Sequence, residues 1–182
     1  MTTRLFTWMF FLTSFLGLAS CSKKEEEPVK PPVQSVVTTV YLVRHAERDN
    51  ASSPTDPTLS AAGEARARAL QQVLANIPVA ALFTTDTRRT RATLAPLATA
   101  TNLVPQVYDA LQPVALATSI RRDYVGKTVV VVGHSNTVLP QIEALGATRP
   151  VTEIAESEYN YLFTLRIVDG GAPTVVVSRY GL

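Results

Sequence analysis

The stretch TTVYLVRHAE, residues 38–47, decides the fold of this chain. Its first half is a run of β-branched, aliphatic and aromatic side chains, which is typical of a strand buried on both faces of a sheet. The run then changes abruptly to the polar residues Arg44, His45 and Glu47. Open α/β sheets place their functional groups at the carboxyl ends of strands, so this strand end is a candidate site. An arginine and a histidine by themselves would equally fit a strand end that only meets water.

A second histidine lies in the same kind of position. The chain contains only His45 and His134, and His134 follows the apolar run at residues 128–132 by one glycine. Between the two runs, short β-like segments alternate with helical patterns, whereas residues 159–168 and 174–178 are typical of a terminal antiparallel hairpin. The sequence therefore predicts an α/β fold with three layers, α/β/α, and a mostly parallel central sheet with an antiparallel margin.

Local signals predict the individual elements. Ser60 is the expected N-cap of one helix, and Asp86 is the expected N-cap of another, which Pro96 should kink or interrupt. The third strand should lie at an edge of the sheet, because Pro105 lacks a backbone donor. The expected strands are residues 35–43, 80–83, 104–108 and 128–132, and further helices are expected at 114–124 and 137–145.

Composition limits the class of protein. A length of 182 residues with 46% hydrophobic content suits one domain, which we place at residues 36–182. A formal charge of +2 at pH 7 predicts no nucleic-acid partner, and nothing in the sequence indicates a protein partner. The single cysteine, Cys21, excludes an intrachain disulfide. No third ligand has a suitable spacing from the histidines for a metal site, so no metal and no other cofactor is expected.

The N-terminus is typical of an exported protein. Arg4 precedes an apolar segment, residues 5–18, that is shorter than the roughly 20 residues of a membrane-spanning helix. The residues LASC at positions 18–21 resemble the lipobox of bacterial lipoproteins. In that family the signal is cleaved before the cysteine, and the cysteine is then acylated. A conventional signal peptide with an incidental cysteine is the alternative.

The lipobox resemblance predicts a location. It implies a signal peptide at residues 1–20, a lipid on Cys21, and a solvated tether that extends to residue 35, because this segment is rich in Lys, Glu and Pro. Ser22 follows the cysteine, as in lipoproteins of the outer membrane. We therefore expect a lipid-anchored protein of the bacterial cell envelope, on the periplasmic or the surface face of the outer membrane.

A group of arginines suggests which ligand the histidines bind. Arg88, Arg89 and Arg91 open the helix after the second expected strand, where positive charge opposes the helix macrodipole. A bound anion would offset that penalty. A guanidinium group can donate two parallel hydrogen bonds to the oxygens of one phosphoryl group, and an imidazole can attack phosphorus. The chain has neither a glycine-rich phosphate loop nor a carboxylate cluster typical of Mg²⁺ sites, so the pattern favours phosphoryl chemistry without a metal.

Four stretches resemble the signatures of the histidine phosphatase superfamily, which has the phosphoglycerate mutase-like fold. The resemblance implies that His45 is the nucleophile that becomes phosphohistidine. It also implies that Arg44 and Arg89 hold phosphoryl oxygens and that His134 completes the pocket. In the order of the family, the stretches are RHAE at 44–47, LSAAGEARARAL at 59–70, TTDTRRTRATLAPLA at 84–98 and VVVGHSNT at 130–137.

The resemblance is less specific for the neighbouring residues. Arg89 is preferred to Arg88 because the signature arginine of the family stands four residues before a threonine, here Thr93. Glu47 and Asn136 lie beside the two histidines in sequence. Each of them either binds substrate, orients a histidine, or makes only a local hydrogen bond in its loop.

The proton donor is the open question. Many members of the family carry an acidic donor between the second arginine motif and the second histidine. Within residues 103–122 this chain has only Asp109, in a segment that first indicates a turn. An enzyme without a donor should favour leaving groups that need little protonation, as small phosphohistidine phosphatases of the superfamily do.

These observations together predict a function. We expect a phosphatase that needs no metal and acts on a small phosphorylated substrate, either a phosphomonoester or a phosphohistidine-like compound. The alternative is a binding module for phosphorylated ligands that kept the pocket but lost the proton donor. The only other partner expected is the membrane, through the lipid on Cys21.

Overall fold

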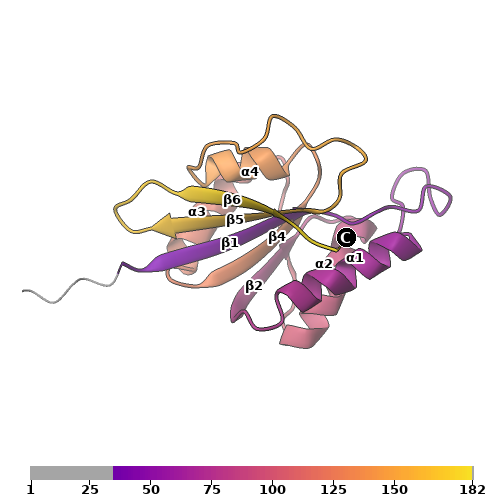
Figure 1. The fold of residues 1–182 in the computed structure, drawn as a ribbon, viewed down its shortest axis with the longest axis horizontal. Helices are drawn as coiled ribbons and strands as arrows, with labels where there is room; N and C mark the ends of the chain where they lie inside the picture. The colour runs from indigo at the N-terminus through magenta and orange to yellow at the C-terminus, as the bar shows by residue number, and fades with distance from the viewer. Residues whose placement is uncertain (1–34, 182) are drawn as a thin grey trace, which may run out of the picture. The chain divides into compact units, whose positions relative to one another are not determined.

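The computed structural model describes residues 35–181, so the predicted signal peptide, Cys21 and nearly all of the tether lie outside the described residues. The described chain forms one mixed sheet with the strand order β3-β2-β4-β1-β5-β6 (Figure 1). No helix within this range is long and apolar enough to cross a membrane. In chain order the elements are β1 Val37–Arg44, α1 Ala61–Val73, β2 Val79–Thr84, α2 Arg88–Thr101, β3 Gln106–Val107, α3 Pro113–Asp123, β4 Thr128–Gly133, α4 Val138–Ala144, β5 Tyr161–Val168 and β6 Thr174–Arg179.

The central strands run parallel. β1 pairs with β4, β4 with β2, and β2 with the short β3, all in parallel, whereas β5 and β6 form an antiparallel margin. The register between β1 and β4 aligns Arg44 with Gly133, and the register between β2 and β4 aligns Thr84 with Val132. The carboxyl ends of β1, β2 and β4 therefore meet at one edge of the sheet. This arrangement confirms the predicted fold class.

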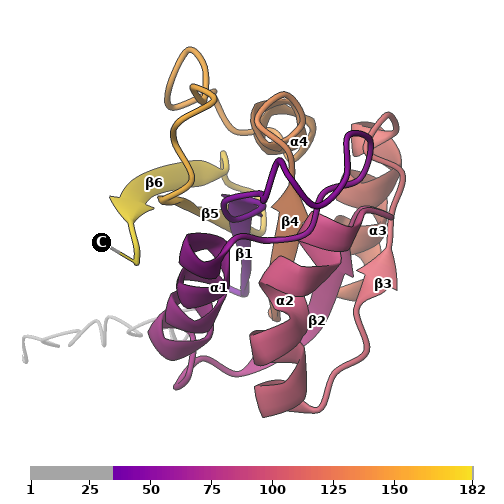
Figure 2. The same ribbon diagram turned by 90° about the vertical axis from the view of Figure 1, so that its right-hand side faces the viewer.

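Helices cover both faces of the sheet. Val130 and Val132 of β4 pack in one cluster with buried leucines of α1 and α2. Val129 and Val131, one step along the same strand, pack in another cluster with apolar residues of α3 and α4. Figure 2 shows the two helix pairs on opposite sides of the strands. Because alternate side chains of a strand point to opposite faces, the run of four valines builds both layers at once.

The start of α2 differs from the prediction. Thr87, not Asp86, is the N-cap residue, and its side chain accepts a hydrogen bond from the backbone N–H of Thr90. Asp86 instead forms an exposed ion pair with Arg91 at 2.7 Å. Aspartate and threonine both cap helices well. Here the Asp86 carboxylate is engaged by Arg91, and the hydroxyl of Thr87 makes the capping hydrogen bond.

Of the two predicted effects of proline, the interruption at Pro96 is wrong, and the edge position of the strand at Pro105 is confirmed. α2 runs through Pro96 without interruption, because the buried Leu94 and Leu97 hold the turns on either side against the core. The strand expected at residues 104–108 is reduced to Gln106–Val107. Pro105 has no N–H to donate and therefore limits this edge strand, as expected of proline in a sheet.

The start of α1 packs tightly against the segment that follows β1. Ser60 is the N-cap, as predicted, and its Oγ accepts a hydrogen bond from the N–H of Gly63 at 3.2 Å. The N–H of Ser60 donates to the backbone oxygen of Glu47 at 3.0 Å. A Cβ atom at Gly63 would lie 2.1 Å from that same oxygen of Glu47. Only glycine allows the helix to approach this closely.

Gly63→Ala should therefore destabilise the protein. In a helix without this contact, alanine would be more stable than glycine by roughly 0.5–1 kcal/mol, so the sign of the change is diagnostic. We expect a loss of about 1–3 kcal/mol in the free energy of unfolding, measured by urea denaturation, because the helix must move away from Glu47. Gly171→Ala is the matched control, since a Cβ there would make only ordinary contacts, at 3.5 Å or more. Equal stability of Gly63→Ala and the wild type would contradict this account.

Candidate active site

Arg44 ends β1 with its guanidinium group buried, and the residue is only 2% exposed. Its Nη1 donates to the backbone oxygens of Ala155, Glu156 and Glu158 at 2.7, 3.1 and 3.1 Å. Its Nη2 donates to Oε2 of Glu156 at 3.1 Å, and the ring of Tyr159 lies 4.2 Å from the guanidinium carbon. Nε is buried and has no hydrogen-bond partner within residues 35–181. The Nε–H of this buried cation is thus left without a partner in this part of the chain.

His45 follows Arg44 and is also buried. Its backbone N–H donates to the oxygen of Gly133 at 2.9 Å, which ties it to the end of β4. Its Nδ1 lies 2.8 Å from the backbone oxygen of Ala46. A carbonyl oxygen only accepts hydrogen bonds, so Nδ1 carries the proton and Nε2 keeps its lone pair. The neutral ring is therefore prepared for nucleophilic attack through Nε2.

Burial is the main reason that His45 is neutral. It lowers the pKa of His45 to about 3, and the positive charges of Arg89 and Arg44 also act in this direction, while the bond to Ala46 opposes it. Protonation would place a third cation beside two guanidinium groups in a poorly hydrated position. The imidazole is consequently neutral throughout the physiological pH range.

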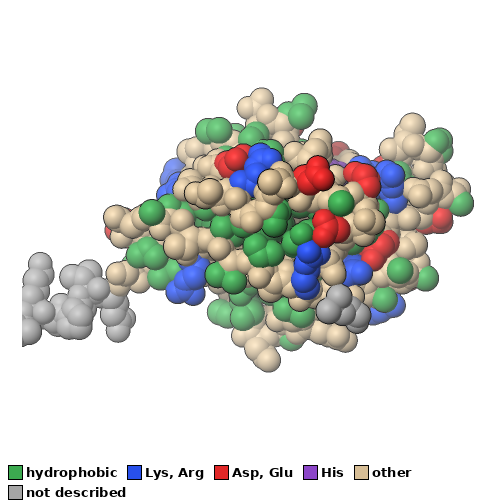
Figure 3. Space-filling view, turned by 45° about the horizontal axis from the view of Figure 1, so that its top comes forward, with side chains coloured by type: hydrophobic (Ala, Val, Ile, Leu, Met, Phe, Trp, Pro, Cys, Tyr) green, Lys and Arg blue, Asp and Glu red, His purple; other side chains and the backbone are tan. Residues whose placement is uncertain are grey.

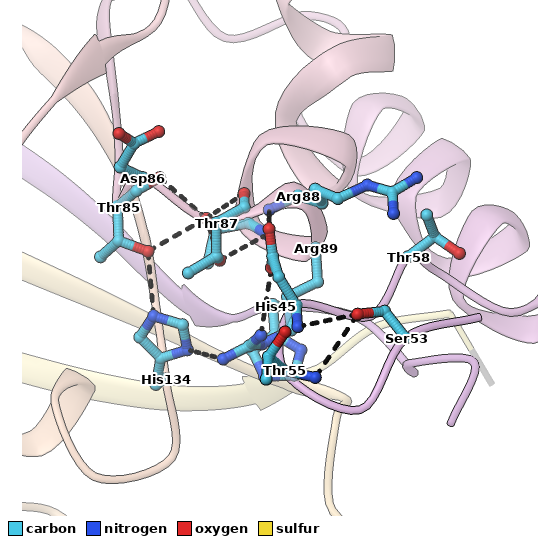
Figure 4. Close-up of polar contacts among 12 residues, drawn as sticks. His45, Ser53, Thr55, Thr58, Thr85, Asp86, Thr87, Arg88, Arg89 and His134 are labelled. Atoms are coloured by element: carbon cyan, nitrogen blue, oxygen red, sulfur yellow. Dashed lines mark hydrogen bonds and ion pairs between the residues drawn. The ribbon is translucent and has the colours of Figure 1, made fainter. Parts of the chain in front are cut away.

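His134 follows β4 and faces His45. The two ring centroids are 5.4 Å apart in an edge-to-face arrangement. Nη2 of Arg89 lies 3.4 Å from Nδ1 of His134, and because a guanidinium only donates, Nδ1 is the acceptor. The proton therefore lies on Nε2, which donates to Oγ1 of Thr85 at 2.9 Å (Figure 4). Burial, and then the charges of Arg89 and Arg44, lower the pKa of His134 to about 4.

Thr85 fixes this tautomer of His134. Its hydroxyl lies 3.0 Å from that of Thr90, which in turn donates to the backbone oxygen of Thr85 at 3.0 Å. The Thr85 hydroxyl thus accepts from His134 and donates to Thr90. Sequence reasoning missed this residue. The signal was present, because a pair of threonines ends β2 at the same edge of the sheet as both histidines.

Arg89 enters the site from the first turn of α2 (Figure 4). Its backbone oxygen accepts a hydrogen bond from Oγ1 of Thr93 at 2.7 Å, and the same Oγ1 accepts from the N–H of Ala46 at 2.9 Å. This link fixes α2 against the loop of His45. Nε of Arg89, like that of Arg44, is buried without a partner in the described part of the chain. Two unpaired guanidinium N–H groups next to a nucleophilic imidazole fit a phosphoryl group.

Asp56 is an anion at the arginine-rich start of α2, where its negative charge offsets the unfavourable interaction of the arginines with the helix macrodipole. Its carboxylate accepts from the N–H of Arg88 at 3.1 and 3.2 Å, and Oδ1 lies 3.5 Å from Nη1 of Arg89. Arg88 itself is exposed, and Arg91 is held at the surface by its ion pair with Asp86. Among the three arginines, the structure thus brings only Arg89 to the histidines. Asp56 lies in a loop without periodicity and was not singled out from sequence.

The two residues with open roles lie beside the site. Glu47 makes a bidentate contact with Arg66 of α1, with the shortest distance at 2.7 Å, and Arg66 also donates to the backbone oxygens of Tyr180 and Gly181. This network links the site loop to the C-terminal segment. Asn136 is exposed and lines a cavity of about 360 Å³ next to His134. A contact of either side chain with substrate stays a prediction.

Asp109 lies in the turn between β3 and α3. The residue is exposed, and its Oδ1 accepts a hydrogen bond from the N–H of Leu111 at 2.8 Å. This contact is the turn chemistry that the sequence first indicated. A role as proton donor stays a prediction. Within residues 35–181 no group of three or more His, Cys, Asp and Glu side chains is arranged to hold a metal ion.

Comparisons with known proteins give a similarity to one family and a fold. A model of the family described as "Histidine phosphatase superfamily (branch 1)" matches residues 40–116. A search of curated proteins gave no significant match.

Three solved structures illustrate the similarity. The protein histidine phosphatase SixA complexed with tungstate is 16% identical, with a TM-score of 0.63 over 79% of this chain and 97% of that one. A mycobacterial glucosyl-3-phosphoglycerate phosphatase is 14% identical, with a TM-score of 0.60 over 80% of this chain and 99% of that one. A putative alpha-ribazole-5'-P phosphatase from Escherichia coli is 10% identical, with a TM-score of 0.60 over 79% and 95%. At these identities the structures establish the fold. The family model adds a sequence similarity to the histidine phosphatase superfamily over residues 40–116, and the chain shares its fold with these phosphatases.

Proposed function

We propose that this chain is a phosphatase that hydrolyses phosphomonoesters or phosphohistidine-like substrates through a phosphohistidine on Nε2 of His45, without a metal ion. The observation that carries the proposal is the state of His45, whose Nδ1–H is held by Ala46 while Nε2 keeps its lone pair. Two similar proteins were solved with tetrahedral oxyanions, SixA with tungstate and the mycobacterial phosphatase with inorganic phosphate. A phosphoryl group has the same tetrahedral shape and negative charge.

The proposed reaction has two steps. In the first, the Nε2 lone pair of His45 bonds to phosphorus, the bond from phosphorus to the leaving group breaks, and the leaving group takes up a proton from solvent. In the second, water attacks the phosphohistidine and gives up one proton to solvent, the bond from phosphorus to Nε2 breaks, inorganic phosphate leaves, and the imidazole is restored. Arg44 and Arg89 place permanent positive charge beside the phosphoryl oxygens in both steps. Phosphoryl transfer asks mainly for such positioning and charge stabilisation.

Phosphate release from p-nitrophenyl phosphate tests this function. The purified full-length chain should hydrolyse this ester in the presence of a chelator, because its good leaving group needs little help from a proton donor. His45→Ala should abolish turnover. Arg89→Ala should lower the rate on the order of 100-fold to 1000-fold, as expected when one stabilising donor is lost.

Arg88→Ala is the matched control, since this neighbouring arginine is exposed and should leave the rate unchanged. If the wild type turns over no faster than His45→Ala, the proposal that the chain hydrolyses simple monoesters is rejected. The alternative would then be a binding module for phosphorylated ligands, and phosphate binding to the wild type would be measured directly.

The proposal also requires both histidines to be neutral. Their lowered pKa values, about 3 for His45 and about 4 for His134, predict that both rings stay largely neutral from pH 8 to pH 5. In the unfolded chain both rings take up protons near pH 6.5, so the free energy of unfolding should fall as the pH drops below this value. Ring-nitrogen chemical shifts in NMR spectra give the midpoints, and His45→Ala assigns the two signals. A midpoint near pH 6.5 for either folded ring would contradict the proposed state of the site.

We further propose that the enzyme is anchored by lipid to the outer membrane of the bacterial cell envelope. The support is the LASC sequence that ends at Cys21 and the serine that follows it. Expression in a Gram-negative host with labelled palmitate should label the wild-type chain. Cys21→Ala should be unlabelled and should appear in the soluble fraction. Equal labelling of the variant, or none of the wild type, would leave a conventional signal peptide as the explanation.

A further inference from the structure

Glu156 reaches from the loop before β5 to two sides of the site. Its Oε2 accepts from Nη2 of Arg44 at 3.1 Å and lies 3.9 Å from Nη2 of Arg48. Its Oε1 accepts from Oγ of Ser135, the residue after His134, at 3.2 Å. The side chain is nevertheless 72% exposed. The carboxylate therefore spans the ends of β1 and β4 on the solvent side of the buried pocket.

The charge of Glu156 is maintained by its partners. Arg44 is the main reason that the pKa of this carboxyl is lowered, and Ser135 and Arg48 contribute in the same direction. The group is thus ionised at neutral pH. Figure 3 shows a small area of histidine surface with acidic and basic side chains around it, so the opening of the site is charged rather than apolar.

Each of the two arginines in the site already has a carboxylate partner. Glu156 pairs with Arg44, and Asp56 pairs with Arg89 at 3.5 Å. The two imidazoles between them are neutral. A phosphoryl dianion adds negative charge to a group whose charges already compensate each other. Further negative charge on the leaving group would be repelled by the Glu156 carboxylate, whereas positive charge would be attracted.

Space for a leaving group lies next to Glu156. A cavity of about 360 Å³ is lined by Ser135, which holds the carboxylate, and by Ile154, two residues before it. Arg149 and Glu153 are the charged residues of its wall, and Arg149 is paired with Glu143 at 2.8 Å. Glu156 is thus in contact with both Arg44 of the site and Ser135 of the cavity wall, and this wall carries little free positive charge.

We propose that Glu156 makes the site select substrates by the charge of the leaving group. It favours phosphoryl compounds with a cationic or neutral leaving group and disfavours those that carry a carboxylate near the phosphoryl group. This inference rests on the proposed function and names the class of substrate. Because the carboxylate is exposed, the effect for two ligands that differ by two charges is on the order of tenfold.

Two small inhibitors test the selectivity. O-phosphoethanolamine carries an ammonium and 2-phosphoglycolate carries a carboxylate at nearly the same distance from phosphorus. As competitive inhibitors of p-nitrophenyl phosphate hydrolysis by the full-length chain, the first should bind the wild type more tightly. Glu156→Gln should reduce the ratio of the two inhibition constants by roughly tenfold, mainly through tighter binding of phosphoglycolate, because Arg44 and Arg48 are then unpaired. High salt should shrink the wild-type preference, since surface charges are screened.

Two variants separate charge selection from other causes. Glu158→Gln lies on the same loop, where its carboxylate contacts the N–H of Ala155 and Arg179, and it should leave the ratio unchanged. Glu64→Gln removes an exposed negative charge on α1 and controls for net charge. An unchanged ratio in Glu156→Gln, or the same change in Glu158→Gln, overturns the inference. If p-nitrophenyl phosphate is not hydrolysed, the proposed function fails, and the same ratio is measured as dissociation constants by calorimetry, so the two failures stay distinguishable.

Discussion

The burial of the Arg44 guanidinium is the constraint on which the site depends. A guanidinium is always charged and cannot leave water without hydrogen-bond partners, so a residue that is 2% exposed must find them in the protein. Here three backbone oxygens, a carboxylate and an aromatic ring from residues 155–159 supply them. One cation at the end of β1 thereby fixes the loop that precedes β5. That loop in turn carries Tyr159 to within 6.0 Å of His45, measured between ring centroids.

The same cations add to the effect of burial on the state of the histidines. Two guanidinium groups that cannot lose a proton lie beside two imidazoles that can, so the imidazoles remain neutral. Burial is the larger cause for both rings, and the arginine charges add to it. Neutrality alone does not make a nucleophile. The oxygen of Ala46 selects the tautomer of His45, and the hydroxyl of Thr85 selects that of His134, so each ring presents a defined nitrogen.

The sequence predicted those parts of the site that follow from strand position. The apolar runs before His45 and His134 indicated interior strands, and parallel strands bring their carboxyl ends to one edge, so the sequence placed the two histidines at the same edge of the sheet. Arg89 came from the family signature, and the structure shows the physical link, through Thr93 to the loop of His45. Glu156 and Asp56 could not be found this way, because they lie in loops whose conformation no periodicity describes. Their places are set by the buried arginines, which act across long stretches of chain.

Charge compensation explains how such a site can be both stable and active. The arginine-rich start of α2 needs an anion, and Asp56 satisfies this need before any ligand binds. Glu156 does the same for Arg44. These carboxylates weaken the attraction for any anion, yet they hold each guanidinium in place, so little reorganisation remains when a phosphoryl group arrives. In phosphoryl transfer the negative charge lies on the equatorial oxygens throughout. In the proposed reaction, rate acceleration therefore depends on where the guanidinium groups are held, because the carboxylates already compensate their charge.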